Sequence, residues 1–185
     1  MDYKQKLIQF NSTEKYASKV SFLFNMMCPT TGDKILDYGC GLGRTVRMLR
    51  LKYGAQAYGY DVNNYREEDD EHLFRQAYHF SFDKIYFMHS FAHIPDVDDL
   101  FYKIDDWALK RSGQIYVITP NRAWTDLLKD KNPGYMPDRT VARHYTIDEL
   151  EELFLSKNFS IINIGQFGEV KQGINERLFI HARNR

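Results

Sequence analysis

An acid and three alternating glycines follow a short apolar stretch: Asp37, Gly39, Gly41 and Gly43. Glycine permits positive φ angles and lets the backbone approach a ligand closely. Because the turn leads into a predicted helix, the free N–H groups and the dipole of the helix N-terminus favour an anionic group there. An acid directly before the turn favours a cationic or donor group on the same ligand. Together, the two preferences indicate a ligand with an amino-acid end.

A second acid, Asp61, ends the next predicted strand. In an open α/β sheet, ligands bind outside the carboxyl ends of the strands, where a carboxylate can accept both hydroxyls of a ribose. A dinucleotide-binding domain also combines a glycine turn with an acid. Its Gly-x-Gly-x-x-Gly pattern, however, requires glycine where Arg44 stands. The spacing therefore disfavours a dinucleotide site.

Three histidines, His89, His93 and His144, are candidates for proton transfer because imidazole titrates near neutral pH. His89 directly follows a predicted strand, a position that suits cofactor contact, so His93 and His144 are the preferred candidate bases. Each of the three could instead be a hydrogen-bonded structural residue. No metal site is predicted, since only Asp96 lies near His93 at ligand spacing.

Hydrophobic periodicity and turn residues place these candidates on alternating strands and helices. Strands are predicted at 34–37, 57–61, 84–88, 114–119, 159–164 and 177–182. Helices are predicted at 42–53, 97–110 and 147–156, with a further helix within an N-terminal helical cap, residues 1–30. The last two strands leave no room for a helix between them, so we expect them to form a hairpin.

This order predicts an α/β, Rossmann-like fold: a mostly parallel sheet with helices on both faces and an antiparallel strand hairpin at the C-terminal edge. Residues 66–79 have weak periodicity and are expected to form a loop or short helix. Residues 121–143 contain Pro133-Gly134 and Pro137 and are expected to make a long excursion. The chain, 1–185, is predicted to be a single domain.

The composition is that of a globular protein, with 43% hydrophobic and 27% charged residues. The 25 Lys and Arg residues balance 25 Asp and Glu residues, so no net field attracts nucleic acid or an anionic membrane. Two cysteines suit a reducing compartment, and no stretch resembles a signal peptide or a membrane span. We therefore expect a cytoplasmic protein without nucleic-acid or membrane partners. The sequence leaves the oligomeric state open.

Taken in order, these segments resemble the class I S-adenosylmethionine-dependent methyltransferase family, of the small-molecule type. Its first motif matches Asp37 and the three glycines, with Cys40 where many members have cysteine, and Asp61 matches its ribose-binding acid. His93 falls where small-molecule members often carry histidine. Later family segments resemble residues 82–94, 119–122 and 144–150.

The resemblance implies S-adenosylmethionine as cofactor and methyl transfer to an oxygen or nitrogen of a small metabolite. It implies cofactor contacts from Asp37, Gly39, Cys40, Gly41, Gly43, Asp61, Val62 and His89. The excursion after the 114–119 strand covers the acceptor in this family. Substrate contacts are accordingly expected from Trp124, Tyr135, Met136 and Tyr145, although these side chains could instead pack the loop against the protein.

Two departures from the family pattern leave alternatives open. Only residues 62–82 separate Asp61 from the fourth motif, so the middle strand-helix unit is expected to be shortened. Ala92 stands where an acid commonly precedes the family's histidine. Both departures support an alternative, a catalytically idle S-adenosylmethionine-binding or partner protein. A protein or nucleic-acid methyltransferase is less favoured, because the Asn-Pro-Pro-Tyr-type motif is absent.

Overall fold

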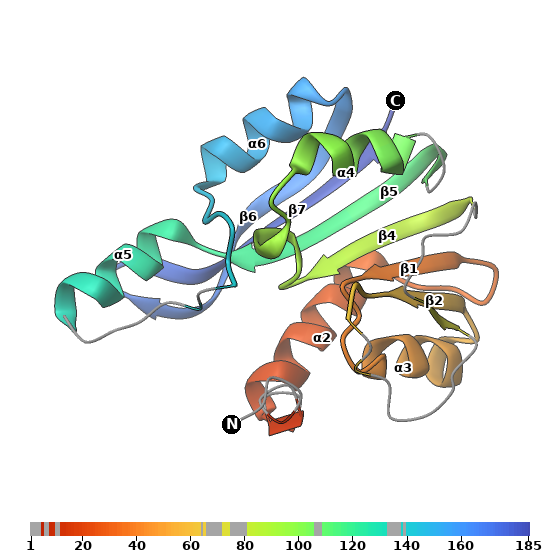
Figure 1. Ribbon diagram of the computed structural model, residues 1–185, viewed down its shortest axis with the longest axis horizontal. Helices are drawn as coiled ribbons and strands as arrows, with labels where there is room; N and C mark the ends of the chain where they lie inside the picture. The colour runs from red at the N-terminus through yellow and green to blue at the C-terminus, as the bar shows by residue number, and fades with distance from the viewer. Residues whose placement is uncertain are drawn as a thin grey trace.

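The computed structural model describes residues 5, 8–9, 12–63, 65, 72–74, 81–105, 109–132, 138 and 140–185. Within this part of the chain, seven strands form one mixed sheet in the order β3-β2-β1-β4-β5-β7-β6 (Figure 1). The strands are β1 (Lys34–Tyr38), β2 (Gln56–Tyr60), β3 (Leu73–Phe74), β4 (Phe82–Met88), β5 (Leu109–Pro120), β6 (Phe159–Lys171) and β7 (Ile174–Asn184). The helices are α2 (Glu14–Met27), α3 (Arg44–Tyr53), α4 (Val97–Lys103), α5 (Arg122–Lys131) and α6 (Ile147–Ser156), with a 3-10 turn η1 (Phe91–His93).

Strands β1 to β5 run parallel to one another, and β7 runs antiparallel to β5 and β6. This arrangement confirms the predicted mostly parallel sheet with an antiparallel hairpin at its edge. The carboxyl ends of the parallel strands share one edge of the sheet, which we call the carboxyl edge. Since Arg177 pairs with Pro120, the first residues of β7 lie at the carboxyl edge as well.

Helices cover both faces of the sheet: α2 and α3 lie on one face, and α4 and α6 lie on the other (Figure 1). The alternation of side chains along β5 feeds both layers. Tyr116 and Ile118 pack in the cluster that contains α2 and α3, whereas Ile115 and Val117 pack in the cluster that contains α4 and α6. Burial of apolar side chains on both faces explains why the central strands read as nearly continuous hydrophobic runs.

Local signals fix the ends of several helices. The Thr13 side chain accepts a hydrogen bond from the Tyr16 N–H and caps the start of α2, and Cys28, in the left-handed conformation, caps its end. A reciprocal capping box joins Thr146 and Glu149 at the start of α6. These caps satisfy backbone groups that would otherwise have no partner within the helix.

One predicted helix is too long. The α-helical part of the span expected at 97–110 ends at Lys103, Ile104 and Asp105 continue as a π-helical turn, and β5 begins at Leu109, earlier than the expected strand at 114–119. Leu109 pairs with Phe82 across an irregularity in β4, so strand pairing extends β5 through a charged stretch without strand periodicity. Tertiary pairing overrides the local signal there.

Three other segments differ from the sequence expectation. The excursion at 121–143 contains a helix, α5, whose N-terminus is capped by the Asn121 side chain. The C-terminal hairpin is longer than predicted, since its strands continue up to a two-residue turn, Gln172-Gly173. Both turn residues have positive φ angles, which suit a tight two-residue hairpin. A two-residue strand, β3, lies within the segment expected to be a loop or short helix.

Candidate functional site

The glycine turn after β1 has a backbone that only glycine adopts readily. Gly39, Gly41 and Gly43 have φ angles of 86°, 52° and 69°. A Cβ atom on Gly39 would collide with the Ser90 side chain, and one on Gly43 would collide with Leu73. Conformation and close packing therefore both require glycine, and the turn is pressed against the neighbouring strands.

The turn is bound to the end of β2. The Gly39 and Cys40 N–H groups donate to the Tyr60 carbonyl, at 2.7 and 3.0 Å. Helix α3 begins directly afterwards with Gly43 as its N-cap, and no side chain of the described residues caps it. The positive end of the α3 dipole thus faces the turn, which is the arrangement that favours an anionic ligand group.

Asp61 lies against the same turn. Its Oδ2 accepts a hydrogen bond from the Gly41 N–H and its Oδ1 accepts one from the Asn63 N–H, both at 2.9 Å. Burial raises the pKa of the Asp61 carboxyl, while these backbone hydrogen bonds oppose that rise. The next side chain, Val62, is 71% exposed although it is apolar. A carboxylate and an exposed apolar side chain therefore stand together beside the glycine turn.

Asp37 lies beneath the turn rather than on its surface, with 3% of its surface exposed. Burial raises its pKa to about 7; the neighbouring Tyr86 hydroxyl lowers it, and the charge of Asp61 raises it. Near neutral pH, a much larger fraction of the Asp37 carboxyl is therefore protonated than for an exposed aspartate. A cationic group on a ligand in the turn would favour the ionised form.

The segment after β4 packs on the glycine turn from the other side. The Ser90 hydroxyl donates to the Tyr38 carbonyl, and the His89 N–H donates to Ile118 O at 2.9 Å. His89 itself has a φ of 67°, and burial lowers its pKa well below the usual value. The ends of β1, β4 and β5 are therefore linked through this segment, and His89 is held neutral.

His93 and His144 come from separate segments that meet at the same edge. His93 ends η1, and its Nδ1 lies 2.9 Å from the Thr140 hydroxyl oxygen. Burial lowers the pKa of His144, and the charge of His93 contributes to that shift. The charge of His93 also acts on His89. The structure thus brings the three predicted histidines to one region of the carboxyl edge.

A charged cluster that sequence reasoning missed lies at this edge too. Glu176 accepts ion pairs from Lys15 at 2.7 Å and from Arg177 at 2.8 Å. Burial and, to a smaller extent, the charge of Arg177 lower the pKa of the neighbouring Lys19 to about 7. The cluster joins α2 to the start of β7. No local pattern could reveal it, because its members come from opposite ends of the sequence.

The aromatic candidates have different surroundings. Trp124 is buried in α5, with the Lys171 ammonium 5.0 Å from its ring centroid. Tyr145 is fully buried in the α4/α6 layer, where its ring lies 5.5 Å from that of Phe91. Tyr135 and Met136 lie outside the described residues. The two described rings therefore pack against the protein.

In the part of the chain that the structure describes, no group of three or more His, Cys, Asp or Glu side chains is arranged to hold a metal ion. The same residues include no helix with the length and apolar character of a membrane span.

Comparison with known proteins gives one family and many similar folds. A family model described as a methyltransferase domain matches residues 7–164. Among curated proteins, none matches the chain. An S-adenosylmethionine-dependent methyltransferase from Archaeoglobus fulgidus is similar in structure, with a TM-score of 0.69 and 16% identity over 99% of this chain and 100% of that chain.

Two further solved structures resemble the chain. One is magnesium protoporphyrin IX methyltransferase from Synechocystis with bound S-adenosylhomocysteine, with a TM-score of 0.67 and 16% identity over 100% of this chain and 89% of that chain. The other is geranyl diphosphate C-methyltransferase from Streptomyces coelicolor, with a TM-score of 0.66 and 15% identity over 99% of this chain and 84% of that chain. At these identities the likeness establishes the fold.

The strand order, the glycine turn with its acids and the family match all indicate the same kind of protein. The chain belongs to the methyltransferase domain family, as an enzyme of the class I, S-adenosylmethionine-dependent type.

Proposed function

We propose that the protein transfers a methyl group from S-adenosylmethionine to an oxygen or nitrogen of a small metabolite. The observation that carries this proposal is the contact between two segments of the carboxyl edge. The glycine turn, with Asp61 hydrogen-bonded to it, packs directly on the segment that leads to the histidines. Donor and acceptor would therefore meet on adjoining segments.

The donor would lie across the glycine turn and the end of β2. The amino-acid end fits the turn, because the α3 N-terminus favours its carboxylate and the buried Asp37 favours its ammonium group. The Asp61 carboxylate would accept the ribose hydroxyls, and the exposed Val62 side chain would cover an apolar face of the adenine. The complete set that we propose for donor binding is Asp37, Gly39, Cys40, Gly41, Gly43, Asp61, Val62 and His89.

Methyl transfer from a sulfonium requires in-line attack by an atom with a free lone pair. Proximity and alignment can supply about 7–11 kcal/mol of the acceleration. A base is needed only when the attacking hydroxyl or ammonium must lose a proton, and we assign that role to His93, with His144 as the second candidate. Of the four residues expected to contact substrate, Tyr135 and Met136 are proposed for that role, whereas the buried Trp124 and Tyr145 are proposed to pack beneath it.

A small acceptor is supported by two of the similar structures, whose names give a tetrapyrrole and an isoprenoid diphosphate as acceptors. The formal net charge of zero supports it too, because a nucleic-acid substrate favours a basic protein. The neighbours' acceptors differ widely in chemistry, so they favour small molecules as a class rather than one compound.

The test is methyl transfer from donor carrying a labelled methyl group. Purified protein is incubated with the donor and with a cell extract separated into small molecules and macromolecules. We expect protein-dependent label in the small-molecule fraction, and its loss with Asp61→Ala. Label in the macromolecular fraction would overturn the small-metabolite assignment. Donor binding without any labelled product would instead support the idle binding protein that the short interval between Asp61 and Phe82 and the presence of Ala92 allow.

A further inference from the structure

A short segment that follows α5, with described residues 138 and 140–143, contacts His93 through the side chain of Thr140. The Thr140 hydroxyl oxygen lies 2.9 Å from His93 Nδ1 and 2.7 Å from Asp138 Oδ1. The same carboxylate oxygen also accepts the Thr140 N–H at 2.9 Å. Thr140 therefore stands between an acid and the candidate base.

The hydrogen-bonding capacity of these groups fixes the direction of both bonds. An ionised carboxylate only accepts, so the single hydroxyl proton of Thr140 is donated to Asp138. The Thr140 oxygen then has only lone pairs to offer His93, which requires Nδ1 to carry a proton. In a neutral imidazole the other nitrogen, Nε2, is then the unprotonated one.

Backbone contacts hold this segment against η1. The Ala142 and Arg143 N–H groups both donate to the Ala92 carbonyl, at 2.8 and 3.0 Å, and the Val141 N–H donates to Asp138 O at 3.2 Å. Ala92 is the residue directly before His93, and it is fully buried. The distance between Thr140 and His93 is thus set by the backbone on both sides, not by two long, mobile side chains.

We infer that Thr140 is a positioning residue that holds His93 in the tautomer with Nδ1 protonated and Nε2 free, and that Asp138 polarises Thr140 for this purpose. Asp138 is thus connected to His93 through Thr140, although Ala92 occupies the position where the family commonly has an acid. The catalytic consequence rests on the proposed function. When the acceptor atom bonds to the methyl carbon, the carbon–sulfur bond breaks and its electron pair stays on sulfur. The acceptor's proton passes to His93 Nε2, and the imidazolium keeps its Nδ1–H bond to Thr140.

The tautomer can be measured without any acceptor. In protein labelled with ¹⁵N-histidine, imidazole ¹H–¹⁵N spectra distinguish a protonated Nδ1 from a protonated Nε2, and the spectrum of His93→Gln identifies the signals of His93. We expect the Nδ1–H form in the unaltered protein. Thr140→Val should shift His93 towards the Nε2–H form, Asp138→Ala should do so partly, and Thr140→Ser should restore the original spectrum.

His181 provides an internal control by the same reasoning. Its Nε2 lies 3.0 Å from the side-chain amide oxygen of Gln114, Oε1. Because that oxygen only accepts hydrogen bonds, His181 should show the opposite tautomer, Nε2–H, in every variant. An Nε2–H form of His93 in the unaltered protein, or a His93 spectrum that Thr140→Val leaves unchanged, would overturn the inference.

Methyl transfer and donor binding separate this inference from the proposed function. Thr140→Val should reduce methyl transfer at least tenfold while S-adenosylhomocysteine binds with unchanged affinity, and Thr140→Ser should recover most of the activity. An altered tautomer with undiminished transfer would overturn the assignment of His93 as base. If the unaltered protein does not bind S-adenosylhomocysteine, the proposed function is overturned, while the tautomer result stands by itself.

Discussion

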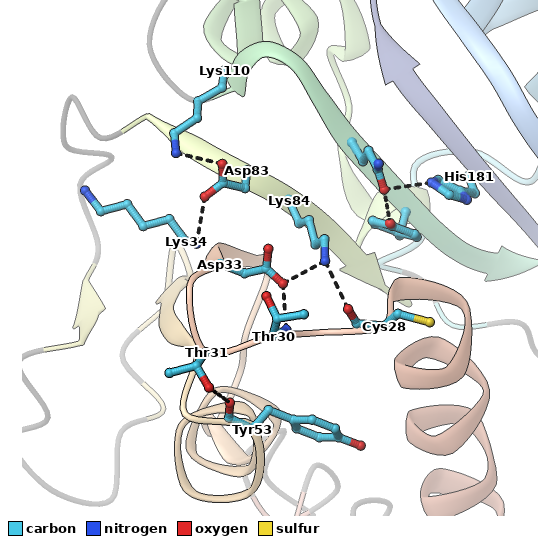
Figure 2. A network of polar contacts seen from close by, with 12 residues as sticks. Cys28, Thr30, Thr31, Asp33, Lys34, Tyr53, Asp83, Lys84, Lys110 and His181 are labelled. Atoms are coloured by element: carbon cyan, nitrogen blue, oxygen red, sulfur yellow. Dashed lines mark hydrogen bonds and ion pairs between the residues drawn. The ribbon is translucent and has the colours of Figure 1, made fainter.

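The two edges of the sheet treat their charged groups differently. At the amino edge, where β1, β4 and β5 begin, two acids, Asp33 and Asp83, each face a lysine (Figure 2). Asp33 lies 2.7 Å from Lys84, and Asp83 lies 2.6 Å from Lys110. Lys84 also donates to a backbone carbonyl, that of Cys28. Burial alone would raise the pKa of Asp83, but the hydrogen bonds from Lys110 and the Lys34 N–H, together with the charges of Lys110 and Lys84, lower it.

At the carboxyl edge, burial dominates at three groups, whereas at Glu176 it is outweighed by the hydrogen bond from Lys15 and the charges of Arg177, Lys19 and Lys15, which lower the pKa. Burial raises the pKa of Asp37 to about 7, lowers that of Lys19 to about 7 and lowers that of His89. Ion pairs at the amino edge stabilise the charged forms, whereas the carboxyl edge favours neutral forms of several groups. Shifted pKa values in one region are typical of sites prepared for ligands and proton transfer. We therefore propose that the amino edge stabilises the fold and that the carboxyl edge binds ligands and carries out the chemistry.

The largest expected effect concerns the pH dependence of stability at Asp37. Its native pKa, about 7, lies above the usual value of 3.8, so the native state retains the proton longer than the unfolded state. Stability from this group is fully present below about pH 4 and falls as the pH rises to about 7. Asp37→Asn removes that loss. It should gain up to about 4 kcal/mol over the unaltered protein at pH 8 and little at pH 4, as measured by urea unfolding.

Asp83→Asn at the amino edge is the matched control. Because the native pKa of Asp83 is lowered, its stabilisation is present above its unfolded pKa and is lost as the pH falls. The control should therefore lose stability at pH 8, opposite in sign to Asp37→Asn. Equal behaviour of the two variants would remove the proposed difference between the edges.

The next effect concerns Gly39→Ala. Its positive φ and the collision of a Cβ with Ser90 should cost about 3 kcal/mol of unfolding free energy. Gly32→Ala is the matched control, because a Cβ there would meet nothing within 4 Å and its effect should stay within about 1 kcal/mol. Thermal or urea unfolding of both variants measures the difference. Similar stabilities would show that the turn can relax away from β4.

A smaller effect is expected for Lys84→Met. Removal of the ammonium leaves Asp33, which is largely buried, without that ion pair and should cost about 1–3 kcal/mol of unfolding free energy. Because Lys84 lies at the amino edge, the affinity of the folded protein for S-adenosylhomocysteine should not change. A large loss of affinity in the folded variant would show that the two edges are coupled.

Local sequence patterns predicted much of the fold and the position of the glycine turn. Gly39, Gly41 and Gly43 could be predicted because their requirement for positive φ is local, and Asp61 could be predicted because it ends the adjacent strand. The helix expected at 97–110 begins where predicted, but its end was wrong, since pairing of Leu109 with β4 places residues 109–110 in β5. No local pattern records such a pairing.

Contacts between distant segments could not be predicted. Lys15 meets Glu176, and Thr140 meets His93, only after the chain has folded. Tyr145 was expected to contact substrate from its place in a family segment, but its burial in the core depends on the packing of η1, α4 and α6 around it. Side-chain roles at the carboxyl edge thus depend on tertiary structure more than the turn itself does.

The most direct test of the central claim is calorimetric titration with S-adenosylhomocysteine. We predict one site per chain, an affinity reduced about 10- to 100-fold by Asp61→Ala at the carboxyl edge, and no change with Asp33→Ala at the amino edge. Absence of binding at high micromolar concentration, or equal affinities in the unaltered protein and Asp61→Ala, would contradict that claim.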